Sequence, residues 1–294
     1  MNIVKPKFEE INITNPLKRI ERCARVCYKS ESKITDDSWK QLICDRLEPS
    51  GHTAMFEHCG IYFTIPLNDF DPKGFPSHGI VRILKSPYSR CNVYAADDKY
   101  YVSTNLRVIY ENEKDLYDEI IEHEGVMNFK SKKYENLEFC DYFSVSPDKQ
   151  RLFVPRYTFI FTMDRIGSQS FCRHRVFSFA QESTRWCNYS SNNKFGHEIS
   201  ISYPCWLKEE DEKEFEEDMK TVENLYFKWI DKGYITEEAR YFLPFGLKTE
   251  IVMTGFPDAW KHFFDLRIDS HAHKQARELA TPLLEYFKEH KYII

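Results

Sequence analysis

Apolar residues recur along the chain with two different spacings, and each spacing predicts a different element. In residues 16–30, Cys23 and Cys27 are four positions apart, which places them on one face of a helix. In residues 58–65, apolar and polar side chains alternate instead. We therefore expect a strand there, entered by a turn over 51–57.

The segment 66–155 is expected to be an inserted unit, because irregular connections bracket it. One connection covers 66–79, where prolines and glycines recur, and the other covers 144–155. Between them, the patterns predict a strand over 99–103 and a helix over 113–125 that Gly125 ends.

Strand and helix signals continue after the insertion. A strand is expected over 156–166, and Asp164 is placed to cap a short helix that ends near an arginine-rich stretch. A long amphipathic helix ends at Gly233 and has its apolar face at Phe215, Met219, Val222, Tyr226 and Trp229. Three more helices are expected from Thr236 to Pro244, over about 247–264, and over 270–289, where Pro282 can bend the last one.

Composition restricts the class of protein. The chain has 294 residues, 42% of them apolar, which suffices for a substantial core in one large or two ordinary domains. A formal charge of −5 argues against nucleic-acid binding, and no apolar run is long enough to cross a bilayer. Without the apolar core of a secretory signal, a cytoplasmic protein is expected, and its nine cysteines are interpreted as buried packing residues.

Residues 171–190, FCRHRVFSFAQESTRWCNYS, concentrate positive charge in a protein of negative net charge. Arg173 and Arg175 would lie about 200° apart on a helix, so they can serve one ligand only if a helix ends beside them. The hydroxyl-rich stretch that ends at Arg185 is typical of a phosphate site. The alternative interpretation is a surface salt-bridge network with the acidic helix at 208–218.

Two other chemistries fit these residues poorly. A nucleophilic Ser183 would need a base, and His174 is nine positions away with no carboxylate placed to orient it. A metal site at His271 and His273 is disfavoured, because residues two apart on a helix face different sides. No metal is therefore expected.

Four motifs resemble those of the flavin-dependent thymidylate synthase family. Arg173-His174-Arg175, followed after seven residues by Ser183, matches the R-H-R-x7-S signature of that family. Three further stretches resemble other elements of that family, and all four motifs follow the family's order along the chain. They are GHTAMFEH (51–58), EARYFLP (238–244) and FFDLRIDSHAHKQARELA (263–280).

The resemblance implies an α+β fold with mixed helices packed on an antiparallel sheet. It implies a single domain over 1–294 that carries the insertion at about 66–155. The implied reaction is the reductive methylation of dUMP to dTMP, with methylenetetrahydrofolate as carbon donor, FAD as redox cofactor and NADPH as reductant. A homotetramer with active sites between chains is also implied, and neither nucleic acid nor membrane is expected as a partner.

The resemblance also assigns site residues. Those for dUMP are Ser170, Arg173, Gln181, Glu182, Ser183, Thr184, Arg185, Arg240 and Arg267. Those for FAD are His52, Ala54, Glu57, Arg173, His174, Arg175, Gln181 and His262. Arg267 is the expected catalytic residue, because a fixed guanidinium beside the uracil stabilises the negative charge that makes C5 nucleophilic. No protein nucleophile is then needed, so Cys172 and Cys187 are expected only to pack.

One departure from the family pattern concerns the flavin. Where the family usually has an N-x-R run, this chain has Phe256 and Asp258, which leaves flavin groups without donors. We expect Asn105 and Arg107, in the insertion, to reach the flavin or nucleotide pocket of their own or a neighbouring subunit. The simpler interpretation is that Asn105 makes a turn and Arg107 lies in solvent.

Two other functions stay open from the sequence. One is a different flavin- or nucleotide-dependent enzyme that acts on a related pyrimidine. The other is a nucleotide-binding regulator without catalysis, against which the presence of Arg185, Arg240 and Arg267 argues.

Overall fold

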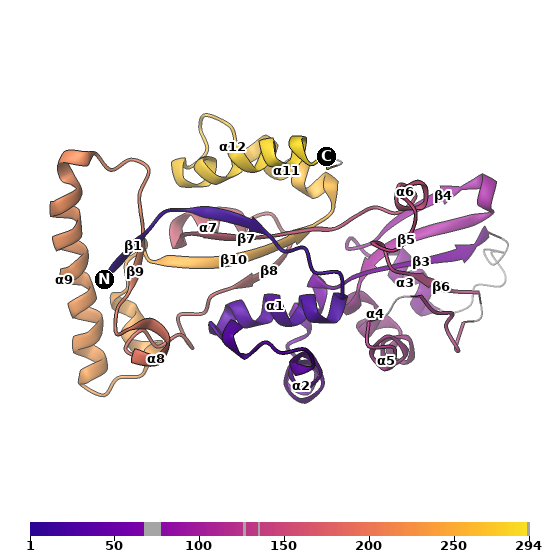
Figure 1. Cartoon of the computed structure of the whole chain (residues 1–294), viewed down its shortest axis with the longest axis horizontal. Helices are drawn as coiled ribbons and strands as arrows, with labels where there is room; N and C mark the ends of the chain where they lie inside the picture. Colours follow the sequence, from indigo (N-terminus) through magenta and orange to yellow (C-terminus); the bar gives the residue numbers. More distant parts are fainter. Residues whose placement is uncertain (68–77, 126–127, 135, 293–294) are drawn as a thin grey trace.

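The computed structural model describes residues 1–67, 78–125, 128–134 and 136–292. Within these residues the chain forms two four-stranded antiparallel sheets and one two-stranded parallel sheet, with helices packed around them (Figure 1). The expected α+β class is therefore confirmed.

The central sheet is covered on both faces. Its strands, in spatial order, are β2 (Lys7–Glu10), β7 (Tyr157–Asp164), β10 (Lys248–Gly255) and β8 (Ser178–Gln181). Phe161 and Met253 pack in the core formed with α11 (Pro257–Arg267) and α12 (Lys274–Glu289). Val252 packs with Cys23 of α1 (Pro16–Tyr28) on the opposite face. Figure 1 shows these helices above and below the sheet.

The second sheet joins the segment 66–155 to the residues before it. Its strands, in spatial order, are β4 (Arg90–Tyr94), β5 (Lys99–Asn105), β3 (Gly60–Pro66) and β6 (Glu138–Cys140). The surrounding helices are α3 (His78–Lys85), α4 (Leu106–Asn112) and α5 (Lys114–Glu122). Phe63 of β3 shares a core with Leu116 of α5 and with Trp39, so the segment has its core in common with earlier residues.

The remaining elements are short, apart from α9. Strands β1 (Asn2–Val4) and β9 (Ser200–Ser202) pair in parallel. The helices are α2 (Ser38–Leu42), which continues as a π-helix over Ile43–Leu47, α6 (Pro147–Gln150), α7 (Arg165–Phe171), α8 (Asn192–Phe195), α9 (Glu212–Asp231) and α10 (Thr236–Ala239). Short 3-10 turns cover Glu31–Lys33, Thr53–His58, Ala95–Asp97, Glu209–Asp211 and Arg240–Phe242. No described helix is both long and apolar enough to span a bilayer.

Most predicted elements are confirmed, but the helix expected over 247–264 is wrong. Its first half is the central strand β10, and the helix α11 starts only at Pro257. The apolar run of β10 is buried on both faces and therefore lacks the alternation that indicates a half-buried strand. Helix α12 continues through Pro282, and most of the expected 66–79 connection lies outside the described residues.

The cysteines do not all pack in the core. Cys187 is buried, as expected, whereas Cys172 is exposed just beyond the last turn of α7. Cys91 is exposed on the edge strand β4, and Cys44 and Cys205 are also exposed. These four positions correct the prediction: Cys172, Cys91 and Cys205 lie at a helix end, on an edge strand and between elements, and Cys44 lies on the exposed side of the π-helix.

Gly255 allows a close approach at the end of β10. A Cβ atom added there would lie 2.5 Å from the Phe177 ring, whereas one added at Gly246 would meet Ile201 at 3.8 Å, an ordinary contact. We expect Gly255→Ala to lower the free energy of unfolding by about 1–3 kcal/mol through overpacking, measured by urea denaturation. Gly246→Ala is the matched control and should change stability much less. Equal effects of the two substitutions would contradict this account.

Candidate functional site

The R-H-R stretch lies in the loop between α7 and β8. Asp164 caps the start of α7 with its side chain, and the helix ends at Phe171. His174 is buried beyond this end, whereas Arg173 and Arg175 are exposed. The expected helix end is confirmed, and both guanidiniums can reach a ligand from the loop.

His174 holds Arg267 at the end of α11. The Arg267 Nε–H donates to His174 Nε2 at 2.9 Å, and because a guanidinium keeps its proton, His174 must be neutral with its own proton on Nδ1. Burial, the Arg267 charge and nearby His262 lower the pKa of His174 to about 4. The ring centroids of His174 and His262 are 5.7 Å apart. These three predicted residues therefore meet in one cluster.

Gln181 is the last residue of β8, and Glu182 begins the next loop, which is the predicted phosphate loop that ends at Arg185. The Gln181 side-chain amide donates to Ser168 Oγ at 2.8 Å. The buried Glu182 carboxylate accepts hydrogen bonds from the Tyr189 hydroxyl at 3.0 Å and the Lys248 ammonium at 2.9 Å. Because these partners satisfy the Glu182 charge within the chain, Glu182 fixes the loop, and its contact with dUMP stays a prediction.

The loop is also tied to α1. The Ser183 amide donates to the Cys27 carbonyl at 3.0 Å, and Ser183 Oγ accepts from the Arg185 amide at 3.3 Å. Thr184 is buried and Ser170 is half-buried in the last turn of α7. The backbone of the predicted phosphate loop is therefore anchored, while Arg185 itself is exposed.

Arg185 and Arg240 meet on one carboxylate. Arg185 Nε lies 2.8 Å from Glu237 Oε1, and Arg240 Nη2 lies 3.8 Å from the same oxygen. The structure thus brings two predicted phosphate-binding arginines together, with Glu237 where an anion could bind. The sequence analysis missed Glu237, although its position three residues before Arg240 was a usable signal.

The alternative interpretation of a salt-bridge network with the 208–218 helix is wrong for Arg185, which pairs with Glu237. Among the described residues, Arg173 and Arg175 form no ion pair at all. Their guanidiniums are therefore available to an anion. Among the described residues, no hydrogen bond or ion pair joins Arg185, Arg240 and Glu237 to the cluster of His174, Arg267 and His262.

The GHTAMFEH element forms a 3-10 turn over Thr53–His58. His52 and Ala54 are exposed, and Glu57 is half-buried with one carboxylate oxygen 2.6 Å from Arg107 Nη1. His58 points inward, with Nδ1 2.8 Å from Thr254 Oγ1, and burial with nearby Arg156 lowers its pKa to about 3. Within this element, His52, Ala54 and Glu57 lie toward the surface, where a ligand could reach them, whereas His58 does not.

Phe256 and Asp258, which depart from the family pattern, contact the segment 66–155 through Arg90. One guanidinium nitrogen of Arg90 lies 2.6 Å from Asp258 Oδ2, and its Cζ lies 4.6 Å from the Phe256 ring centroid. Arg156 approaches the same ring, at 5.2 Å. Sequence reasoning did not identify Arg90, because nothing in its neighbourhood along the chain connects it with residues 256–258.

Asn105 and Arg107 have partners within the chain. The buried Asn105 side chain caps α4 by accepting from the Val108 amide at 3.1 Å, so Asn105 joins β5 to a helix and does not make the turn of the simpler interpretation. Arg107 is not left in solvent, since it binds both Glu57 and Glu111. It therefore contacts the GHTAMFEH element, and a direct contact with flavin or nucleotide stays a prediction.

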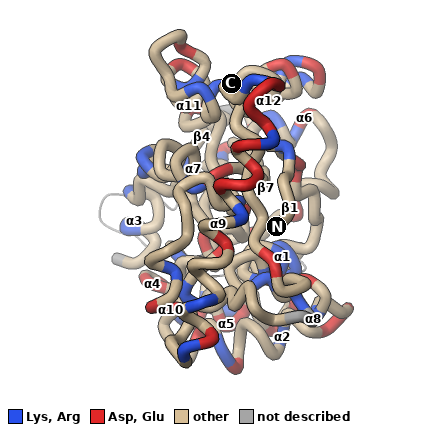
Figure 2. The backbone as a smooth tube through the Cα atoms, turned by 90° about the vertical axis from the view of Figure 1, so that its left-hand side faces the viewer, with Lys and Arg blue, Asp and Glu red and all other residues tan. Residues whose placement is uncertain are grey.

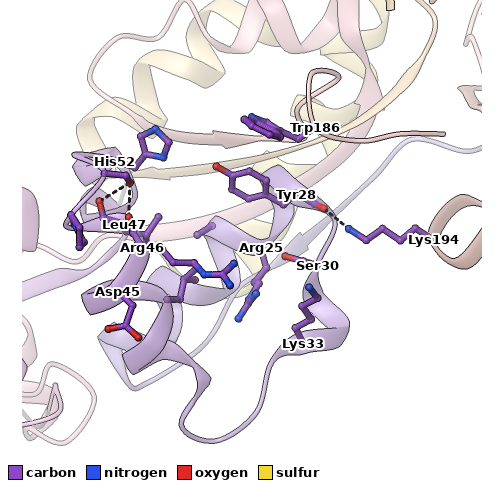
Figure 3. A pocket seen from close by; sticks show the side chains of 14 residues that line it. Arg25, Tyr28, Ser30, Lys33, Asp45, Arg46, Leu47, His52, Trp186 and Lys194 are labelled. Atoms are coloured by element: carbon purple, nitrogen blue, oxygen red, sulfur yellow. Dashed lines mark hydrogen bonds between the residues drawn. The ribbon is translucent and has the colours of Figure 1, made fainter. Parts of the chain in front are cut away.

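A cavity of about 670 Å³ opens beside the loop (Figure 3). His52 and Trp186 line one side of it, and Tyr28 lies next to Trp186 with ring centroids 6.2 Å apart. Because Trp186 directly follows Arg185, the cavity adjoins the predicted phosphate loop along the chain. Its size suits a small organic ligand.

The neutral state of His174 makes stability depend on pH. Its pKa is about 4 in the folded chain against about 6.5 when unfolded, so the unfolded chain takes up the proton first as the pH falls. The folded state is therefore penalised as the pH falls from 6.5 towards 4. Between pH 7 and pH 5 we expect the wild type to lose up to about 2 kcal/mol more stability than His174→Gln, measured by urea unfolding. His58 is present in both proteins, and equal losses would contradict the assignment.

Comparison with known proteins shows which family these motifs belong to. The family described as thymidylate synthase complementing protein matches residues 93–290, which include the R-H-R-x7-S, 238–244 and 263–280 motifs. The match begins inside the segment 66–155 and leaves out the GHTAMFEH element at 51–58.

Curated relatives carry the name flavin-dependent thymidylate synthase. The protein of Pyrococcus furiosus is 32% identical over 133 residues, 44% of this chain and 53% of the relative. That of Pyrococcus horikoshii is 32% identical over 164 residues, 50% of this chain and 66% of the relative. That of Sulfurisphaera tokodaii is 36% identical over 134 residues, 45% of this chain and 50% of the relative.

These matches are partial, since the chain spans about half the length of the curated relatives it matches. A solved structure, thymidylate synthase X of Helicobacter pylori with FAD and dUMP, is 20% identical with a TM-score of 0.36, covering 47% of this chain and 70% of that one. The family match alone spans more than half of the chain. The chain therefore belongs to the thymidylate synthase complementing protein family.

Proposed function

We propose that this chain catalyses the reductive methylation of dUMP to dTMP, with methylenetetrahydrofolate as carbon donor, FAD as redox cofactor and NADPH as reductant. The observation that carries the proposal is Arg267, held in place by a neutral histidine. A guanidinium fixed in this way can stabilise negative charge that develops on a pyrimidine ring without having to reorganise during the reaction. Family membership supports the same reaction.

The residues of the loop between α7 and β8, which carries the R-H-R stretch, fit FAD as a bound group. Arg173 and Arg175 are exposed and form no ion pair among the described residues, so both can bind phosphate oxygens. His174 and His262 lie beside them at the base of the site. When bound, FAD supplies the hydride that completes the methyl group.

The chain itself binds and orients the nucleotide in this proposal. Arg185 and Arg240 hold the dUMP phosphate, and Arg267 lies beside the uracil, where it favours attack by C5. His174 is a positioning residue, because its Nε2 fixes the direction of the Arg267 side chain. Neutral His174 adds no competing positive charge.

Exposed apolar residues adjoin the site arginines and support a site formed between chains. Val176, Trp186, Tyr241 and Leu266 are each next to one of these arginines in sequence and are 41%, 64%, 91% and 47% exposed. Exposed apolar side chains beside binding residues are the kind of surface that a neighbouring subunit can cover. We therefore include a homotetramer, with active sites completed by neighbouring subunits, in the proposal.

The proposal is tested by assaying purified protein with dUMP, methylenetetrahydrofolate, FAD and NADPH for dTMP. We expect turnover in the wild type and a fall of at least about 100-fold in kcat for Arg267→Ala, with flavin absorbance retained. Arg277→Ala is the matched control, since Arg277 donates to the Ser270 carbonyl. Binding of dUMP without any dTMP would instead favour a regulatory protein, and full activity of Arg267→Ala would remove Arg267 from the mechanism.

Glu237 competes for the proposed phosphate site. Its carboxylate occupies Arg185 and Arg240 and must leave when a phosphate binds them. Because exposed ion pairs of this kind contribute up to about 1 kcal/mol, Glu237→Gln should tighten dUMP binding by up to about fivefold, measured by calorimetry. Glu214→Gln, on the exposed face of α9, is the control. Weaker dUMP binding by Glu237→Gln would show that Glu237 supports the site instead.

A further inference from the structure

The cavity beside Trp186 has an unusual balance of charge. Its wall carries one carboxylate, Asp45, and four cationic side chains, Arg25, Lys33, Arg46 and Lys194. The chain as a whole has a net charge of −5, and acidic and basic residues are interspersed along the tube in the view of Figure 2. The cavity wall therefore carries an excess of positive charge, although the chain as a whole is negative.

Most of this charge is not neutralised within the chain. Arg25 Nη2 lies 2.7 Å from Glu21, and the Lys194 ammonium donates to the Tyr28 carbonyl at 3.2 Å. In the described parts of the chain, Lys33, Arg46 and Lys194 form no ion pair. Gathering like charges around one cavity costs free energy, which an anionic ligand would recover.

The origin of the four cations indicates the form of the anion. They come from four segments: α1, the Glu31–Lys33 turn, the π-helix after α2, and α8. In the view of Figure 3, Arg25 and Arg46 lie near one another, whereas Lys33 and Lys194 lie apart from them, so the four cations extend along the wall. A single phosphate is usually held by donors that converge on it, whereas a chain of separate carboxylates suits cations spaced along a wall.

We propose that this cavity binds the oligocarboxylate tail of the reduced folate co-substrate, a run of linked glutamates. This inference rests on the proposed function, because that reaction brings a folate to the chain. The position of the cavity agrees with it, since Trp186 links the wall directly to Arg185 of the proposed phosphate loop. Lys33 and Arg46 are then binding residues that set a preference for long tails.

The test compares dTMP formation with monoglutamyl and pentaglutamyl methylenetetrahydrofolate. In the wild type we expect KM for the pentaglutamyl form to be at least about tenfold lower than KM for the monoglutamyl form, because the longer tail gains two charge-assisted contacts. In the double variant Lys33→Glu/Arg46→Glu the ratio of the two KM values should approach one. The control, Lys213→Glu/Lys220→Glu on the exposed face of α9, carries the same change of charge and should keep the wild-type ratio.

The remaining outcomes distinguish failure of the tail site from failure of the proposed function. A wild-type ratio near one, or an unchanged ratio in Lys33→Glu/Arg46→Glu, overturns the tail site. Loss of dUMP or FAD affinity in that variant with the ratio preserved would assign the cavity to a nucleotide phosphate. If the wild type forms no dTMP, the proposed function fails, and calorimetry with the two folates still decides: equal or absent binding overturns the tail site.

Discussion

Strand β10 is hydrogen-bonded on both edges and buried on both faces, so each polar group that it carries must find a partner inside the protein. This constraint organises the site. At the start of the strand, Lys248 neutralises the buried Glu182 and thereby fixes the loop before Arg185. Near its end, the Thr254 hydroxyl forms a hydrogen bond with His58. Gly255 then leads into the helix that ends at Arg267.

The candidate site is built from fixed positive charge around neutral groups. His174 accepts from Arg267 and is kept uncharged by burial and by that guanidinium. Arg185 and Arg240 are held near one another by Glu237, a partner at the surface that can be exchanged for a ligand. In the proposed site, buried groups set the direction of the side chains and exposed groups are left to bind the ligand, so the site can be preformed without being closed.

Local sequence patterns predicted the elements that carry their own signals. Asp164 before a short helix, and the end of that helix just before Arg173, followed from capping and helix geometry. The strand β10 was missed because burial on both faces removes the alternation that marks a strand. The family resemblance assigned both Arg185 and Arg240 to the nucleotide, but it could not show that Glu237 pairs with both of them, since that depends on tertiary packing.

Contacts between segments that are distant along the chain could not be predicted from the sequence. Arg90 and Asp258 are 168 residues apart and meet across the junction of the two sheets. Their pairing also limits how this chain can change. An arginine introduced at 258 would face the Arg90 guanidinium and leave two like charges together, while loss of Arg90 alone would leave the exposed Asp258 to water. An arginine at 258 would thus need a compensating substitution at Arg90, so the residues at these two positions, in separate segments of the chain, constrain one another.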